Sequence, residues 1–192
     1  MLRASMLAPS LRSYALVLPL LVAAMPALMQ ASSPTPAPAS TNISGQDADG
    51  HAVQVNGKGH VTLVMYTNPD LEDESRKMSL ALDPYRSRSD FNFVRVVDLR
   101  GDVPPNMRSM VRTQIRKEIA RESERLKKAG VSGATPSPII PDFSGSTLNA
   151  LGWDSTYEKV RLVVYDAHGH ELKRFQDVTD AKQMAKVVES VL

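Results

Sequence analysis

Residues 61–66 (VTLVMY) constrain the fold of this chain more than any other segment. The run is almost wholly apolar, contains β-branched residues and is short for a helix. It therefore predicts a strand that is buried on both faces, near the middle of a sheet. Such a strand needs covering layers on both sides, so the run favours an α/β layer architecture.

The segment after this strand carries the signals that begin a helix. Asn68 is an N-cap candidate, Pro69 stands at the first helical position, and carboxylates from Asp70 onward fill the first turn. We predict a helix over residues 69–85. These carboxylates could bind a hard cation, but they lack the calcium-loop spacing with its glycine, so we interpret them as partners of the positive helix end.

Strands and helices alternate along the rest of the chain. Strands are predicted at residues 51–55, 91–99, 160–165 and 171–175, with glycine turns at 47–50 and 166–169. Helices are predicted at residues 106–129, ended by Gly130, and at 180–192, capped by Thr179. Residues 131–153 are rich in Pro, Gly and Ser, and a stretch of this kind is usually either functional or disordered.

The helix predicted at residues 106–129 has two faces. Apolar residues cover an arc of about 120°, namely Met107, Val111, Ile115, Ile119 and Leu126. The helix also carries eight basic residues against three glutamates. Its excess positive charge is either a solvated face or a surface for an envelope protein or anionic lipid, with Arg112, Arg116 and Arg125 as candidate binding residues. Glu118 and Glu122 project near the apolar arc, where they either pair with basic neighbours or mark a partner-facing groove.

The chain contains no cysteine. A thiol nucleophile, a redox pair, cysteine ligands for zinc and c-type haem attachment are therefore excluded. No metal or other cofactor is expected. His168 and His170 are close enough in sequence to share a metal, yet a turn with solvated histidines explains them. The string Phe143-Ser144-Gly145-Ser146 fails the G-x-S-x-G pattern of a nucleophile elbow.

The N-terminal residues have the pattern of a secretory signal peptide. Arg3 and Arg12 precede an apolar run at residues 14–29, which is short for a spanning helix and contains two prolines. We predict a signal peptide at 1–31, a Pro/Ser/Ala-rich linker at 32–41 and one domain at 42–192. The domain would be periplasmic or secreted, or else held in the inner membrane by an uncleaved anchor.

The charge of the mature chain limits its partners. Without Arg3 and Arg12, 21 basic residues balance 21 acidic ones. A nucleic-acid-binding domain is usually strongly basic, so no nucleic-acid partner is expected.

Two segments resemble exported thioredoxin-like and peroxiredoxin-like domains. Residues 45–68 (GQDADGHAVQVNGKGHVTLVMYTN) are similar to their opening, where an Asp-Gly turn, a short strand and a second glycine lead into the first central strand. Phe175 and the turn at 166–169 look like their closing hairpin, with the final helix after it. Within this group the chain most resembles the periplasmic YtfJ-type family, over residues 42–192. The resemblance implies a thioredoxin-like mixed sheet flanked by helices, with a long inserted helix and loop.

The departures from this resemblance concern its active site. Active members carry a cysteine pair between the central strand and the first helix, and a cis-proline before the penultimate strand. Here residues 67–72 contain no cysteine and residues 155–159 contain no proline. This implies a non-catalytic protein that acts by binding, with Asn68 and Asp70 as further candidate binding residues. The rival interpretation is an envelope enzyme that uses Asn68, Asp70 and Asp142 in the same cleft.

We expect mass spectrometry of the envelope fraction to find an N-terminus between about Pro26 and Thr41, because cleavage would remove the apolar run. Recovery of intact Met1 in the membrane fraction would support the anchor instead.

We expect the metal-free protein to leave insulin disulfides and peroxide unchanged relative to a no-protein blank, because both reactions require a thiolate. Turnover above that blank would contradict the prediction.

Overall fold

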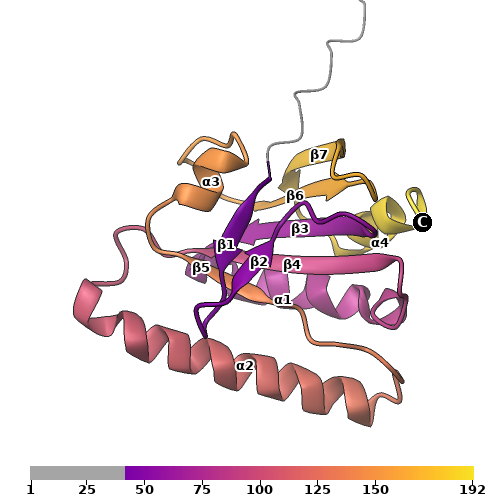
Figure 1. Cartoon of the computed structure of the whole chain (residues 1–192), viewed down its shortest axis with the longest axis horizontal. Coiled ribbons are helices and arrows are strands. Elements are labelled where there is room, and N and C mark those ends of the chain that lie inside the picture. Colours follow the sequence, from indigo (N-terminus) through magenta and orange to yellow (C-terminus); the bar gives the residue numbers. More distant parts are fainter. Residues whose placement is uncertain (1–41) are drawn as a thin grey trace, which may run out of the picture. The chain divides into compact units, whose positions relative to one another are not determined.

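The computed structural model describes residues 42–192, so the predicted signal peptide and linker lie outside the described residues. Within this part, a five-stranded mixed sheet has the order β5-β4-β3-β6-β7 (Figure 1). A separate antiparallel hairpin consists of β1 (Ser44–Gln46) and β2 (Ala52–Gln54). Gly50 in its turn has a φ of +86°, as the predicted glycine turn requires.

The apolar runs form the middle of the sheet. β3 (Val61–Thr67) runs parallel to β4 (Phe91–Asp98) and antiparallel to β6 (Val160–Tyr165). β6 in turn pairs antiparallel with β7 (Glu171–Val178). Every β3 residue after Val61 is buried, which confirms the strand with two covered faces that its sequence predicts.

Different elements cover the two faces of the sheet (Figure 1). On one face, α1 (Glu72–Ala81) and α4 (Ala181–Glu189) pack through residues such as Met78 and Met184. On the other face lie the β1–β2 hairpin and α3 (Ser146–Ala150), where Leu148 and Trp153 join the core. Among residues 42–192, no helix is both long and apolar enough to cross a lipid bilayer.

The long helix α2 (Arg108–Lys128) follows a short 3-10 helix, η3 (Pro105–Met107), and packs at the β5 edge of the sheet (Figure 1). Its apolar arc is confirmed in part. Ile115 and Leu126 are buried, and Ile115 joins a small core cluster with Ile139 and Ala48. Met107 lies in η3 and is 41% exposed. The apolar contact of α2 with the rest of the fold is therefore small.

Two boundary predictions were wrong. Residues 69–85 do not form one helix, because η1 (Pro69–Leu71), α1 and η2 (Asp83–Tyr85) succeed one another, and Pro84 lacks the N–H that a continuing helix needs. Asp180 caps α4 in place of Thr179, since its side chain accepts the Lys182 N–H at 2.9 Å. Residues 131–153, for which the sequence left both a functional and a disordered segment open, contain β5 (Ile139–Asp142), which is parallel to β4, and α3.

Two turns share the pattern Asp-Ala-x-Gly-His and offer a matched test of backbone strain. In each turn an oxygen of the first aspartate accepts the N–H groups two and four residues later, at 2.8 to 2.9 Å. Gly50 and Gly169 both have positive φ, at +86° and +84°. A Cβ on Gly169 would lie 2.9 Å from the Asn56 carbonyl oxygen, whereas a Cβ on Gly50 would meet nothing within 4 Å.

We therefore expect Gly50→Ala to lower the free energy of unfolding by about 1 kcal/mol, through positive φ alone. Gly169→Ala should lower it by at least about 1 kcal/mol more, because the backbone near Asn56 must also move. Urea unfolding measures both changes, and equal losses would contradict the steric argument.

Candidate binding groove

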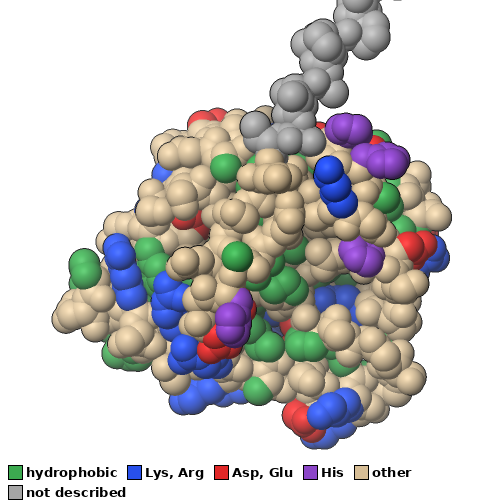
Figure 2. Space-filling model, in the orientation of Figure 1, with side chains coloured by type: hydrophobic (Ala, Val, Ile, Leu, Met, Phe, Trp, Pro, Cys, Tyr) green, Lys and Arg blue, Asp and Glu red, His purple; other side chains and the backbone are tan. Residues whose placement is uncertain are grey.

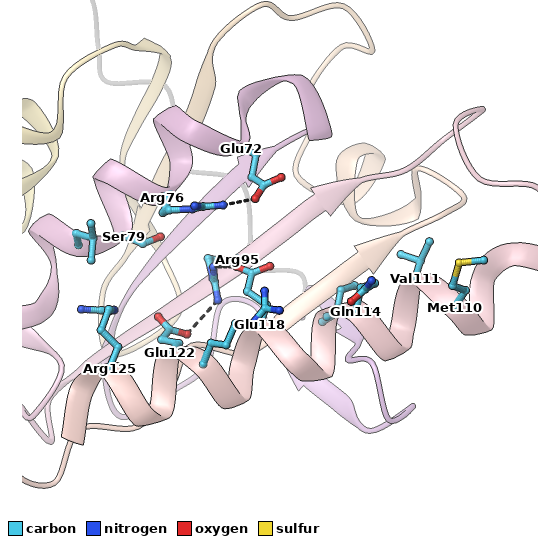
Figure 3. A pocket seen from close by; sticks show the side chains of 13 residues that line it. Glu72, Arg76, Ser79, Arg95, Met110, Val111, Gln114, Glu118, Glu122 and Arg125 are labelled. Carbon is cyan, nitrogen blue, oxygen red and sulfur yellow. Dashed lines mark hydrogen bonds and ion pairs between the residues drawn. The ribbon is translucent and has the colours of Figure 1, made fainter. Parts of the chain in front are cut away.

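A groove lies between α1 and α2, above β4 (Figure 3). Its cavity volume is about 660 Å³, which is within the range of pockets that hold small ligands or side chains of a partner. α1 supplies one wall, α2 supplies the other, and β4 supplies Arg95 between them. The lining residues from α1 are Glu72, Arg76, Ser79 and Leu80, and those from α2 include Met110, Val111, Ile115, Glu118, Arg121, Glu122 and Arg125.

Arg95 reaches from β4 to three partners. Its Nε donates to Ser137 Oγ at 2.8 Å, one terminal nitrogen donates to Glu118 Oε1 at 2.6 Å, and the other donates to Glu122 Oε2 at 3.0 Å. The Arg95 side chain is only 10% exposed. Its planar guanidinium thus fixes two positions of α2 relative to the sheet.

Glu122 is held by a second arginine as well. Arg86 donates to Glu122 Oε1 at 2.7 Å, and the backbone N–H of Ser137 donates to Oε2 at 3.2 Å. Arg86 also stacks over the Phe93 ring, with its Cζ 4.5 Å from the ring centroid. Burial lowers the pKa of Arg86 to about 10, against the opposing attraction of Glu122. Its side chain is only 3% exposed, so these charges form an interior network.

The network answers the question that the sequence raised about Glu118 and Glu122. Both glutamates pair with basic residues, but the partners come from β4 and the segment after η2 and not from α2 itself. Both glutamates also line the groove. A signal for this site was present in the sequence, because Arg95 interrupts an otherwise apolar strand and a buried charge needs a partner.

The mouth of the groove combines apolar and cationic groups. Leu80 from α1 is 44% exposed and Met110 from α2 is 54% exposed, and both of these large apolar side chains line the groove. Arg121 is exposed and, among the described residues, has no ion-pair partner. A ligand in this groove would therefore meet an apolar surface beside an available positive charge.

The three arginines predicted as binding residues are tied to other parts of the domain. Arg112 donates to the Asp47 carbonyl at 2.8 Å, and Arg116 donates to Asp49 Oδ1 at 2.6 Å, so both hold the turn of the β1–β2 hairpin. Arg125 forms an ion pair with Asp83 and also lines the groove. The structure does not gather the three into one surface.

Asn68 and Asp70 lie where β3 ends. Asn68 caps η1, because its Oδ1 accepts the Leu71 N–H at 3.1 Å. Asp70 is exposed in that short helix. Asp142, the third residue of the rival enzymatic interpretation, accepts the N–H groups of Gly145 and Leu148 at 2.8 and 3.0 Å. Its carboxylate therefore caps α3 and is poorly placed to act as a base.

A second polar cluster occupies the carboxyl ends of β3 and β4. Tyr66 donates to Asp142 at 3.4 Å, and Tyr157 donates to Asp98 at 3.3 Å. Burial and these carboxylates raise the pKa of both tyrosines, which keeps the phenols protonated. Burial would raise the pKa of Asp98, but hydrogen bonds from Arg100 and Tyr157 outweigh it and hold that pKa below its usual value. This cluster is a set of satisfied structural pairs.

The hairpin turns place carboxylates beside histidines. Asp47, Asp49 and His51 bring potential ligand atoms within 4.8 Å of one another. Asp49 is already paired with Arg116, and Asp47 already accepts two backbone N–H groups. At the other turn, His170 lies 3.3 Å from Asp166, and the His168 and His170 rings are 6.0 Å apart.

Comparisons with solved structures place the fold. The described domain is similar to Mycobacterium tuberculosis DsbF, with 12% identity over 81% of this chain and 99% of that chain, and a TM-score of 0.55. A thiol:disulfide interchange protein of the thioredoxin family from Chlorobium tepidum gives 16% identity, 83% and 99% coverage, and a TM-score of 0.52. A putative thioredoxin from Neisseria meningitidis gives 17% identity, 79% and 88% coverage, and also a TM-score of 0.52.

These likenesses confirm the predicted thioredoxin-like α/β fold, with its mixed sheet and flanking helices that include a long one. They concern the fold alone, because the identities are low. A scan against protein-family models and a search of curated proteins gave no match.

Replacing Glu122 with alanine should lower the free energy of unfolding by about 3 kcal/mol or more, because Arg86 and Arg95 would lose a shared buried carboxylate. Glu124→Ala is the control, since Glu124 pairs with Lys127 on the exposed surface and should contribute less than about 0.5 kcal/mol. Similar losses in the two variants, measured by urea unfolding, would show that the network does not hold α2.

Proposed function

We propose that this is an exported thioredoxin-fold protein that acts by binding and not by thiol chemistry, and that it receives a segment of an envelope protein in the groove between α1 and α2. The combination of exposed Leu80 and Met110 with unpaired Arg121 carries the proposal. A segment with apolar side chains next to carboxylates would complement this surface.

Export is supported by the basic and apolar pattern of the N-terminal residues. The YtfJ-type resemblance over the domain points to the periplasm in the same way. The absence of cysteine from the chain removes the chemistry that the names of the similar structures describe. A binding role retains the fold and needs no thiol.

The charge of α2 supports an acidic partner. Part of its positive charge is used inside the domain, by Arg116 and Arg125. The remainder includes Arg121 at the groove and Lys117 and Lys128 on exposed positions. Anionic lipid is the competing partner for the same charges, but it would not need the apolar walls that a polypeptide side chain can fill.

The test begins with capture of a stoichiometric partner from envelope extract by the mature chain, followed by titration of that partner. We expect Met110→Glu to weaken binding at least tenfold, because it replaces an apolar side chain of the groove wall with a negative charge that repels the carboxylates of the partner segment. Leu172→Glu is the matched control, since Leu172 is 51% exposed on β7 and does not line the groove.

Binding should also weaken as salt rises, since the Debye length falls from about 10 Å at 0.1 M to about 3 Å at 1 M. A partner that binds both variants equally would place the interface elsewhere. Binding of anionic vesicles with no protein partner would favour lipid.

A further inference from the structure

A second cavity, of about 430 Å³, lies where α2 begins and shares no lining residue with the α1–α2 groove. Arg108 and Arg112, one helical turn apart, both place their guanidinium groups against Phe143. The two Cζ atoms are 5.1 and 5.6 Å from the ring centroid. Two like charges thus converge on one half-buried ring, and Figure 2 shows basic side chains gathered on the face where α2 begins beside the hairpin.

These arginines differ from most others in the described chain. Nine of the twelve arginines at residues 42–192 have a carboxylate within ion-pair distance. Arg108 and Arg112 are two of the three that do not, and both line this one cavity. Arg112 donates to the Asp47 carbonyl, which leaves most of its five N–H donors available. Unlike most arginines of the described domain, Arg108 and Arg112 therefore bring positive charge to this cavity without a carboxylate partner.

Hydroxyl groups also line this cavity. Ser144 and Ser146 line it, and Ser144 Oγ donates to Ser146 Oγ at 3.0 Å, which leaves the hydroxyl hydrogen of Ser146 available. Asp142 also lines it, but its two oxygens accept the N–H groups of Gly145 and Leu148, so both oxygens already have hydrogen-bond partners within the domain. Two guanidinium groups and the Ser146 hydroxyl offer more donors than the two oxygens of a carboxylate accept.

We propose that this cavity binds the phosphate group of a phosphomonoester. Three terminal oxygens can accept from Arg108, Arg112 and the Ser146 hydroxyl together, and planar guanidinium groups suit phosphate geometry. The cavity is larger than a phosphate ion, so it also has room for part of the organic group attached to it. The negative charge would relieve the repulsion between the two arginines over Phe143.

The test is titration of the mature chain with inorganic phosphate and with glycerol 3-phosphate at physiological ionic strength, followed by amide chemical shifts in NMR spectra. We expect saturable binding with shifts centred on residues 143–147. Arg108→Gln should weaken it at least tenfold, as expected for loss of a charge-assisted hydrogen bond. Lys117→Gln is the control, because it removes the same charge from an exposed position on α2 that lines no cavity, and it should change affinity less than twofold.

A third arm uses vesicles that contain phosphatidic acid, with phosphatidylcholine vesicles as the blank. Arg108-dependent binding of these vesicles together with the soluble ligands would identify a lipid headgroup as a source of the phosphate. Binding of the soluble ligands alone would identify a soluble phosphomonoester. Absence of saturable binding, equal losses in the two variants, or binding to vesicles alone would overturn the proposal. Because Arg108 and Lys117 are exposed, we expect both variants to keep the melting temperature of the unmodified chain. That measurement excludes unfolding as the cause of any loss of binding.

Discussion

The carboxylate of Glu122 lies between Arg86 and Arg95, and the position of α2 depends on it. An isolated buried carboxylate would be very unfavourable, so the arrangement is stable only because both oxygens are bonded and Ser137 supplies further donors. The apolar contact of α2 with the sheet is small by comparison, since Ile115 and Leu126 are the only hydrophobic residues within the helix that are buried. Charge-assisted hydrogen bonds, which are directional, therefore set where this helix lies.

The same pairs explain why the groove exists. A helix that packed on β4 through aliphatic side chains would lie close to the sheet and to α1, and would fill the space between them. Arg95 stands in that space, and its partners on α2 are reached by a long side chain. Ion pairs of two other α2 residues, Arg116 with Asp49 and Arg125 with Asp83, add to the restraint. The cavity is thus held open by structure before any ligand arrives, which lowers the entropy lost on binding.

The sequence predicted those parts of the fold whose signals are local. The apolar runs at residues 61–66 and 160–165 gave two strands almost to the residue, and Asn68 was recognised as a cap. β5 was missed because Ile139-Ile140-Pro141-Asp142 is short and contains a proline, which an edge strand tolerates. The groove was missed because its ion pairs join residues 23 to 36 positions apart. Glu122 near an apolar arc and Arg95 in an apolar strand were both visible, but only the tertiary fold brings them together.

The end of β3 shows how this domain differs from the thiol-active proteins it resembles. In those proteins the partial positive charge at a helix N-terminus stabilises a cysteine thiolate. Here Asn68 caps the first turn, and Glu72, Asp73 and Glu74 occupy the start of α1. The chain's own carboxylates complement the field that would otherwise favour an anionic sulfur. An incoming anion would meet fixed negative charge at this end of the sheet, whereas unpaired positive charge is found along α2, at Arg108, Arg112 and Arg121. The field of these charges is therefore more favourable to an anion along α2 than at the start of α1.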